Sequence, residues 1–364
     1  SNQAKAIWIV NYIYCNKMIS EFKFFSELNF FFKNNESFVV FKKPSHNKIV
    51  CQQGDVIDGQ VFDMQNKRGF IFMPFNSNLN GYLLTPKTTI ETQFQLELNK
   101  NQNTDFAVKD FNSKKGSYIK FIKNTIAEIK NSSLEKVVCS SSFKLKMKSK
   151  SPIQYFKRLV QLNHDAFCYL FYHPKIGTWI GASPEKLINL NNGIVTTFAL
   201  AATKKKLDQS WTDKEFREQK IVEDQIVKDL NKDCKNIERG ALQTVKAGNI
   251  YHLKSVIKAK TNKSSTDLIR LLHPTPAVAG LPKNKAVSYI NKKEDYDRSF
   301  YTGFLGLLES KSCDIYVNIR CAKIVDDNLT IYVGGGITND SNAVDEWHEI
   351  LNKSQTMLGI FYQG

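Results

Sequence analysis

Short apolar runs bounded by turn residues recur along the chain. The segments at 38–41 (F-V-V-F) and 69–75 (G-F-I-F-M-P-F) are rich in aromatic and β-branched residues, which is typical of strands. The dipeptide Asn192-Gly193 separates two further runs and predicts a tight hairpin turn. By the same pattern, strands are predicted at 166–172, 178–183, 303–309, 314–323 and 329–335.

Apolar residues at helical spacing predict four helices between these strands. The first covers Tyr118 to Ile129, with Ser117 as its predicted N-cap. The second opens at Ser151-Pro152, because proline suits the first helical turn. The third opens at T-D-K-E (212–215), where Thr212 and Glu215 have capping-box spacing. The fourth closes the chain from about residue 342.

Helices and strands alternate, but several strands are linked by hairpins. This mixture predicts an α+β fold, a large layered sandwich of antiparallel-rich sheets with helices outside, rather than a purely parallel sheet. No linker rich in Pro and Gly, internal repeat or low-complexity tract interrupts the 364 residues. We therefore expect one domain over residues 1–364.

The charge balance is strongly basic, with 51 Lys and Arg against 35 Asp and Glu and a net charge of +16. Such a balance suits nucleic acid or small anions. However, the basic residues are dispersed, and the densest run, Lys204 to Lys206, is only three residues long. Nucleic-acid binding is therefore a second hypothesis that rests on net charge alone.

Cysteine usage indicates a reducing compartment. The seven cysteines are scattered, odd in number and without a C-x-x-C pair, which argues against a disulfide framework and a zinc site. The apolar stretch at 6–10 (A-I-W-I-V) is too short to cross a bilayer, and no signal-peptide cleavage site follows it. We expect a cytoplasmic protein that does not bind membranes.

Two predicted helices carry acidic residues in positions that suit a metal ion. Glu218 shares a helix face with Val222, so it is expected at the rim of a buried face or within it. Glu346, Glu349 and Lys353 share one face of the last helix. Carboxylates from two helices, with no histidine between them, suit Mg²⁺. Salt bridges to nearby lysines explain the same pattern equally well.

Other segments combine special backbone with charge. The glycines of 333–337 (V-G-G-G-I) are expected to form a turn that ends a strand, where the backbone either approaches an anion or only reverses direction. Arg320 is expected in mid-strand, where it would hold a carboxylate of the protein or of a ligand. Glu185 follows a strand, and a place in the first turn of a helix is its simpler explanation. His252 and His273 are interpreted as core histidines.

Taken together, these segments resemble the chorismate-utilising enzyme family and, within it, the isochorismate synthases. The resemblance covers roughly residues 115 to 364, whereas 1–114 resembles only loosely the variable N-terminal half-layer of the same fold. The matching segments, in family order, are K-V-V (136–138), G-A-S-P-E (181–185), L-A-A-T (200–203), D-K-E-F-R-E (213–218), H-L-K-S (252–255), L-L-H-P-T-P-A (271–277), D-R-S-F-Y-T-G (297–303), I-R-C-A (319–322), V-G-G-G-I (333–337) and E-W-H-E-I-L-N-K (346–353).

The resemblance implies chorismate, a dicarboxylate, as the substrate and Mg²⁺ as the cofactor that holds its ring carboxylate. It places the metal on Glu218 and Glu349, with Glu346 close behind. It implies that the substrate's carboxylates and ring lie against one set of residues, Ala202, Thr203, Ala277, Arg320, Gly334 and Lys353.

The resemblance also implies two catalytic residues. Water adds at C2 of the ring while the C4 hydroxyl leaves, with Lys136 as the base and Glu185 as the acid. A carboxyl that donates a proton at neutral pH needs a raised pKa, and a lysine that accepts one must be buried or lie beside other cations. Lysine at 136, and its absence from 199–203, favour water over ammonia as the nucleophile, so no glutamine amidotransferase partner is expected. Salicylate synthases share this lysine and are the alternative.

Three positions differ from the family pattern. Ala202 stands where glycine is usual, Gln219 replaces the usual histidine, and Ser141 takes the place of a common arginine. None of the three removes a predicted catalytic or metal-binding group. The product would supply menaquinone or siderophore synthesis, and the protein is expected to be a monomer or a homodimer.

Overall fold

Antiparallel strand pairing dominates the computed structural model, which describes residues 17–95, 111–147, 151–204, 210–247 and 250–361. The first half of the sheet is a series of neighbouring antiparallel strands, with a two-residue strand added beside β6. In spatial order the strands are β14 (Gly280–Leu281), β6 (Lys136–Lys146), β18 (Asn328–Ile337), β17 (Cys321–Val325), β8 (Gly177–Ser183), β7 (Phe167–His173) and β2 (Phe38–Lys42).

A second half repeats this arrangement, and its last long strand carries two short ones side by side along its other edge. The strands are β4 (Gly69–Met73), β15 (Phe304–Leu308), β16 (Cys313–Val317), β9 (Lys186–Asn191), β10 (Ile194–Lys204) and β13 (Ile250–Lys260), followed by β11 (Lys235–Arg239) and β12 (Gln243–Ala247).

Two long strands, β3 (Lys48–Gly59) and β5 (Gly81–Gln93), join the halves, because β3 pairs with β2 and β5 pairs with β4. The short β1 (Lys17–Met18) runs parallel to β5. An aromatic cluster draws on both halves: Phe72 of β4 stacks on Phe171 of β7, and Phe167 of β7 stacks on Tyr316 of β16. The sheet is therefore folded over an aromatic core, which confirms the predicted layered α+β sandwich.

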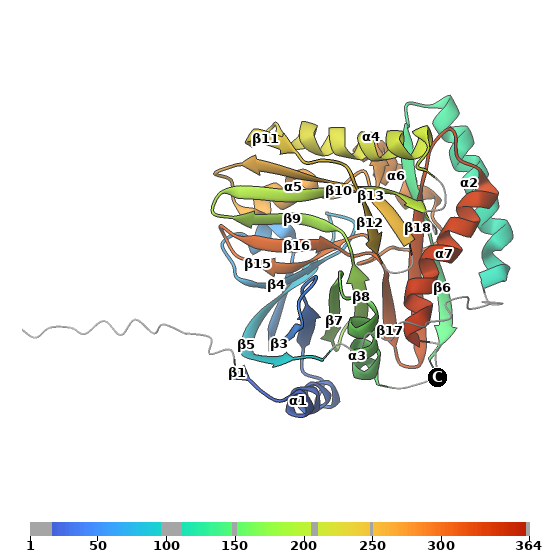
Figure 1. The fold of residues 1–364 in the computed structure, drawn as a ribbon. Coiled ribbons are helices and arrows are strands. Elements are labelled where there is room, and N and C mark those ends of the chain that lie inside the picture. Colours follow the sequence, from blue (N-terminus) through green and yellow to red (C-terminus); the bar gives the residue numbers. More distant parts are fainter. Residues whose placement is uncertain (1–16, 96–110, 148–150, 205–209, 248–249, 362–364) are drawn as a thin grey trace, which may run out of the picture.

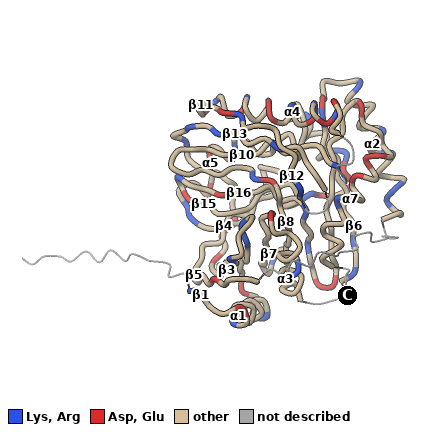
Figure 2. Tube along the Cα trace, viewed as in Figure 1, with Lys and Arg blue, Asp and Glu red and all other residues tan. Residues whose placement is uncertain are grey.

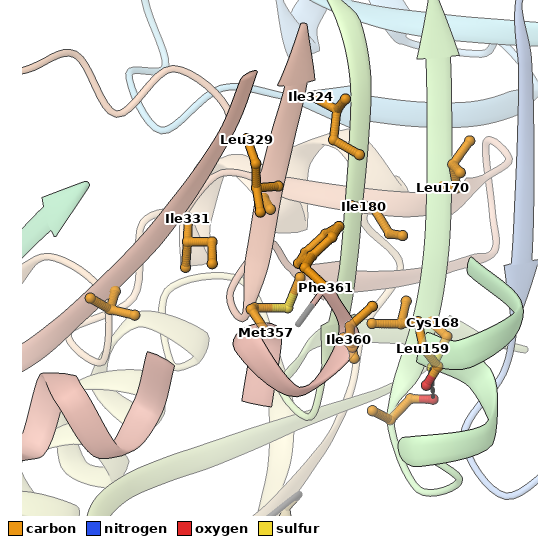
Figure 3. Packing of buried hydrophobic residues seen from close by; sticks show 14 of the residues in the cluster. Leu159, Cys168, Leu170, Ile180, Ile324, Leu329, Ile331, Met357, Ile360 and Phe361 are labelled. Carbon is orange, nitrogen blue, oxygen red and sulfur yellow. Dashed lines mark hydrogen bonds between the residues drawn. The ribbon is translucent and has the colours of Figure 1, made fainter. Parts of the chain in front are cut away.

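Helices cover the outer faces of both halves (Figure 1). Those against the first half are α1 (Glu21–Lys33), α2 (Asn112–Asn131), α3 (Pro152–Leu162), α6 (Lys283–Lys293) and α7 (Ala343–Phe361). Those against the second half are η1 (Val61–Met64), α4 (Asp213–Leu230) and α5 (Ser265–Leu272). Figure 3 shows how the end of α7 packs: Met357 and Phe361 lie against apolar residues of β8, β17 and β18.

Local sequence signals located several elements correctly. Asn192 and Gly193 adopt positive φ angles of 50° and 74° between β9 and β10, as the predicted hairpin requires. Pro152 opens α3, and the Thr212 N–H donates to Glu215 Oε2 over 2.6 Å at the start of α4. The turn and the two helix starts each depend on interactions among a few neighbouring residues, so the sequence alone predicts where they form.

Two local predictions were wrong. Ser117 is not an N-cap, because α2 begins five residues earlier at Asn112, where the preceding Phe111 stacks on Phe143 of β6. The predicted strand at 314–323 is two strands, because β16 pairs with β9 whereas β17 pairs with β8. Arg320 lies in the bend between them, with a φ of 50°.

Charged residues are spread over the described part of the molecule. In Figure 2 the Lys and Arg positions are interspersed with Asp and Glu along the trace rather than gathered on one element. Among the helices in the described part of the chain, none combines the length and apolar character that a bilayer crossing requires.

Candidate active site

A cavity of about 100 Å³ opens where β17 stops short of the end of β18. Pairing between the two strands covers only residues 328–331 of β18, so within the described part of the chain no strand pairs with this edge from 332 to 337. Nine of the eleven predicted site residues line this cavity, and they are Lys136, Glu185, Ala202, Thr203, Glu218, Ala277, Arg320, Gly334 and Lys353. Glu346 and Glu349 do not line it and lie on α7.

Lys136 is the first residue of β6 and only 1% exposed. Its Nζ donates to Glu218 Oε1 over 3.1 Å. Glu218, on α4, keeps 20% of its side-chain surface exposed and lies at the rim, one of the two places predicted for it. Lys136 is therefore held inside the cavity and is not one more solvated surface charge.

The glycines of 334–336 lie inside β18 and pair with β6, so the predicted turn is wrong. Their role is to leave space. A Cβ added to Gly336 would lie 2.8 Å from Glu218 Oε1 and 2.8 Å from Lys136 Cε. Only a residue without a side chain admits this ion pair against the strand.

Glu185 lies between β8 and β9, not on a helix, so the first-turn alternative is wrong. It is 4% exposed. Ser183 fixes its backbone, because the Ser183 Oγ accepts from Glu185 N over 3.2 Å and donates to Val317 O over 2.6 Å. Burial raises the pKa of the Glu185 carboxyl to about 8, against the opposing effect of Lys136, Arg320 and Lys353. This carboxyl is a proton donor at neutral pH.

Arg320 is 9% exposed, and among the described residues no carboxylate forms an ion pair with it. The guanidinium contacts a histidine instead: Arg320 Nη2 lies 2.6 Å from His252 Nε2. Burial lowers the pKa of Arg320 to about 10, although Glu185 opposes the shift. Of the two partners predicted for Arg320, a carboxylate of the protein forms no ion pair with it among the described residues, and a carboxylate of a ligand stays a prediction.

His252 belongs to the cavity wall as well as to the core. Its ring is 7% exposed, and its Nδ1 lies 2.8 Å from Ala202 O. Burial, followed by Arg320 and Lys353, lowers the pKa of His252 well below its ordinary value, so the ring is neutral. Because Arg320 can only donate, His252 Nε2 accepts and Nδ1–H donates to Ala202 O. His273, by contrast, is a core histidine as predicted, with Nε2 3.0 Å from Phe75 O.

Lys353 reaches the cavity from α7. Its Nζ donates to Gly334 O over 3.0 Å and lies 2.7 Å from Glu349 Oε1. Gly334 O therefore faces the unpaired edge of β18, and in an antiparallel strand the N–H of a residue points to the same side as its C=O. The amide of Gly334 is thus directed at the cavity, and its predicted role in binding a carboxylate stays a prediction.

The three predicted metal-binding carboxylates each lie beside a lysine. Glu349 pairs with Lys353, Glu218 with Lys136, and the buried Glu346 lies 3.7 Å from Lys214. The salt-bridge explanation is therefore borne out for these contacts. Within the described ranges, no three His, Cys, Asp or Glu side chains are grouped as a ready-made metal site.

The carboxylates nevertheless fit a magnesium ion chemically. Glu346 Oε2 is buried and has no hydrogen-bond partner among the described residues. Burial and Glu349 raise the pKa of Glu346 to about 7. Oxygens of both glutamates would lie within 3.5 Å of a Cβ added to Gly335, so they converge on one point of β18. Mg²⁺ characteristically takes one or two protein carboxylates and completes its shell with water and substrate oxygens.

An ion pair behind the cavity was missed by the sequence reasoning. Arg298 pairs with Glu294 at 2.6 Å and donates to Val138 O over 2.6 Å and to Val278 O over 2.9 Å. Both valines line the cavity. The D-R-S-F-Y-T-G segment contained this arginine, but nothing in its spacing indicated which backbone carbonyls it would join.

The three departures from the family pattern have clear positions. Ala202 has a left-handed φ of 63° within an irregular part of β10. Gln219 is buried and donates from Nε2 to Ser255 Oγ over 2.9 Å. Ser141 is buried in β6 opposite Val333.

The cationic side chains of Arg320 and Lys353 line, together with Lys136, a cavity whose buried acid is neutral. Cationic walls around a small buried volume suit a small anion with more than one carboxylate. The geometry can therefore bind such a ligand and donate a proton to it.

Comparison with known proteins identifies relatives of this arrangement. The family model described as chorismate binding enzyme matches residues 77–362. The chain is 30% identical over 262 residues to isochorismate synthase DhbC of Bacillus subtilis, covering 65% of each protein. It is 32% identical over 254 residues to isochorismate synthase MenF of Escherichia coli, covering 65% of this chain and 57% of that protein. The matches thus span about three fifths of these curated relatives.

A solved structure gives the same result for the fold. Menaquinone-specific isochorismate synthase MenF from Escherichia coli superimposes with a TM-score of 0.76 at 20% identity, over 90% of this chain and 88% of that one. This likeness extends through the N-terminal part of the described residues and confirms the predicted fold of the family.

Proposed function

Because the chain belongs to the chorismate-binding enzyme family, we propose that it is an isochorismate synthase that converts chorismate to isochorismate with Mg²⁺. One observation carries the proposal: a buried neutral acid, Glu185, and a buried lysine, Lys136, line the same cationic cavity. An isomerisation that moves a hydroxyl group needs a proton donor and a proton acceptor at the ring. The curated relatives named above carry the same activity in their names.

The substrate has two carboxylates, and the cavity offers donors for both. Arg320 offers a guanidinium that no protein carboxylate occupies among the described residues, and Lys353 offers an ammonium group at the edge of β18. Gly334, whose carbonyl accepts from Lys353, offers its amide on the same edge of β18. Ala202, Thr203 and Ala277 line the remaining wall against the ring.

Glu218 and Glu349 would hold Mg²⁺, with Glu346 behind them. A bound Mg²⁺ would supply positive charge to neutralise and orient the ring carboxylate that the cationic wall attracts. The support in this chain is the donor set: three carboxylates beside the glycine strand, one with a buried oxygen that has no partner.

The chain's own residues then move two protons. Lys136 acts here as the unprotonated amine and not as the ammonium of its ion pair with Glu218: its Nζ takes a proton from water as the water oxygen bonds to C2, the ring double bond shifts, and the C4–O bond breaks. Glu185 gives its proton to the departing C4 oxygen, so a second water leaves and the atoms balance. Groups positioned in this way contribute roughly a hundred- to ten-thousand-fold each to the rate.

Water as the nucleophile also limits the partners we propose. No amidotransferase subunit is needed, because the reaction consumes no ammonia. A cytoplasmic location is supported by six free cysteines at 51, 139, 168, 234, 313 and 321, all buried; Cys15 lies outside the described residues. The product would feed menaquinone or siderophore synthesis.

The test is incubation of the protein with chorismate and Mg²⁺, followed by chromatographic separation of the products. Isochorismate as the main product supports the proposal. Salicylate with pyruvate would assign the chain to the lyase branch, and unchanged chorismate would refute the activity. Lys136→Ala and Glu185→Gln should each abolish turnover with an unchanged circular dichroism spectrum. Lys144→Ala, an exposed lysine on the same strand β6, is the matched control and should retain full activity.

A further inference from the structure

The contact between a buried histidine and a buried arginine has no place in the proton transfers above. His252 lies on β13, and Arg320 lies in the bend between β16 and β17. The two side chains meet at 2.6 Å inside the cavity, and among the described residues this is the side-chain contact that the guanidinium makes. The histidine is held in turn by Ala202 O on β10.

We propose that His252 is the positioning residue for substrate binding: it accepts a hydrogen bond from Arg320 and thereby fixes the guanidinium toward a carboxylate of the substrate. This inference rests on the proposed function for the identity of the substrate. It adds a role for a residue outside the acid, the base and the metal-binding carboxylates.

Geometry makes this role specific to a neutral imidazole. Arginine presents only donors, so its partner must offer a lone pair, and a lysine or a protonated histidine there would repel it. The surroundings keep the ring neutral, because it faces Arg320 and Lys353 and lies in a buried wall. One tautomer satisfies both contacts, with Nδ1–H donating to Ala202 O and Nε2 accepting from Arg320.

The left-handed backbone of Ala202 contributes to the same chain of contacts. Its φ of 63° is a conformation that L-residues adopt at a cost, and its carbonyl is the one that holds Nδ1. Thr203 Oγ1 also lies 3.4 Å from Nδ1. The irregular backbone of β10 therefore fixes the orientation of the His252 ring, and the ring in turn fixes the orientation of the Arg320 guanidinium.

Chorismate affinity is the first measurement. In a Glu185→Gln background, which does not turn over, calorimetry should show His252→Ala weakening chorismate binding roughly ten- to a hundred-fold, the range of a lost hydrogen bond to a charged group. His252→Gln restores an acceptor and should recover most of that loss. In the enzyme with Glu185 intact, His252→Ala should raise KM and leave kcat within about threefold, because Arg320 binds the substrate and the transition state alike.

A double-mutant cycle separates positioning from general damage. If His252 acts through Arg320, adding His252→Ala to Arg320→Ala should cost less than about twofold in affinity beyond Arg320→Ala alone. Additive losses would overturn the proposal. His273→Gln is the matched control, because His273 is also buried and neutral with a backbone partner but does not line the cavity; it should lower the melting temperature and leave KM unchanged.

A measurement without ligand keeps this inference distinguishable from the proposed function. The ¹⁵N spectrum of histidine-labelled protein at pH 7, with His252 assigned from the His252→Gln variant, should show a protonated Nδ1 and a bare Nε2. A protonated Nε2 would overturn the positioning role even if chorismate is converted. If the wild type neither binds nor converts chorismate, the function fails, while the tautomer still decides whether His252 holds Arg320.

Discussion

Replacing Glu185 with glutamine should change how the stability of the protein depends on pH. The Glu185 carboxyl has a pKa of about 8 in the folded protein against 4.5 for an exposed glutamate. A group whose pKa is raised on folding contributes stability that is fully present below pH 4.5 and is lost as the pH rises through 8. At about 1.36 kcal/mol per pKa unit, the wild type loses about 4 kcal/mol between pH 5 and pH 8.5, which the neutral glutamine does not lose.

The assay is urea denaturation of both proteins at pH 5, 7 and 8.5, followed through the fluorescence of the buried Trp179 and Trp347. The free energy of unfolding of Glu185→Gln minus that of the wild type should rise by about 4 kcal/mol across this range. Glu128→Gln, an exposed glutamate on α2, is the control and should give a constant difference. A Glu185→Gln difference that stays flat within about 1 kcal/mol would mean that Glu185 is ionised at neutral pH and cannot be the acid.

Three further outcomes follow from the same geometry. Ala202→Gly should raise the free energy of unfolding by about 0.5–1 kcal/mol, because relief of the left-handed conformation exceeds the added entropy of the unfolded chain; a loss of stability in urea denaturation would contradict it. Gly336→Ala should abolish most turnover with a small change in melting temperature, because the new methyl displaces the ends of Lys136 and Glu218; unchanged kcat would be inconsistent with the assigned base. Glu346→Gln should stabilise the protein above pH 7 in magnesium-free buffer, where the raised pKa of about 7 makes the carboxylate costly, and weaken Mg²⁺ binding in calorimetry; equal affinity would exclude Glu346 from the metal site.

What the sequence could predict was decided by local chemistry. The Asn192-Gly193 turn and the Thr212 cap each depend on a few neighbouring residues, and both appear where expected. Ser117 failed because a distant contact, Phe111 against Phe143, extends α2 beyond the local cap signal. Propensity is a weak guide wherever tertiary packing can override it.

The site could be predicted as a set of residues but not as an arrangement. Motif order named nine residues that line one cavity. It did not show that Arg320 lies in a bend between two strands. That bend arises because β16 pairs with β9 whereas β17 pairs with β8. Nor did it show that the glycines of 334–336 belong to a strand, because they are held there by pairing with β6, which is distant in the sequence. The single-domain assignment of residues 1–364 and the expected monomer or homodimer stay predictions.

The glycines of β18 have a consequence for reading variation in this protein. Gly336 leaves room for Lys136 of β6 and Glu218 of α4, and Gly334 leaves room for Tyr301 and for the neighbouring residues of β6. In a saturation library, a score based on the side-chain interactions that a substitution removes would rank these positions as inert, since glycine has no side chain. Their tolerance should instead be among the lowest in the strand, because every replacement occupies volume already assigned to another residue. The intolerance of these positions to substitution comes from the neighbouring atoms that occupy the space beside each glycine. It can be predicted only from those neighbours, because the glycine itself makes no side-chain contact.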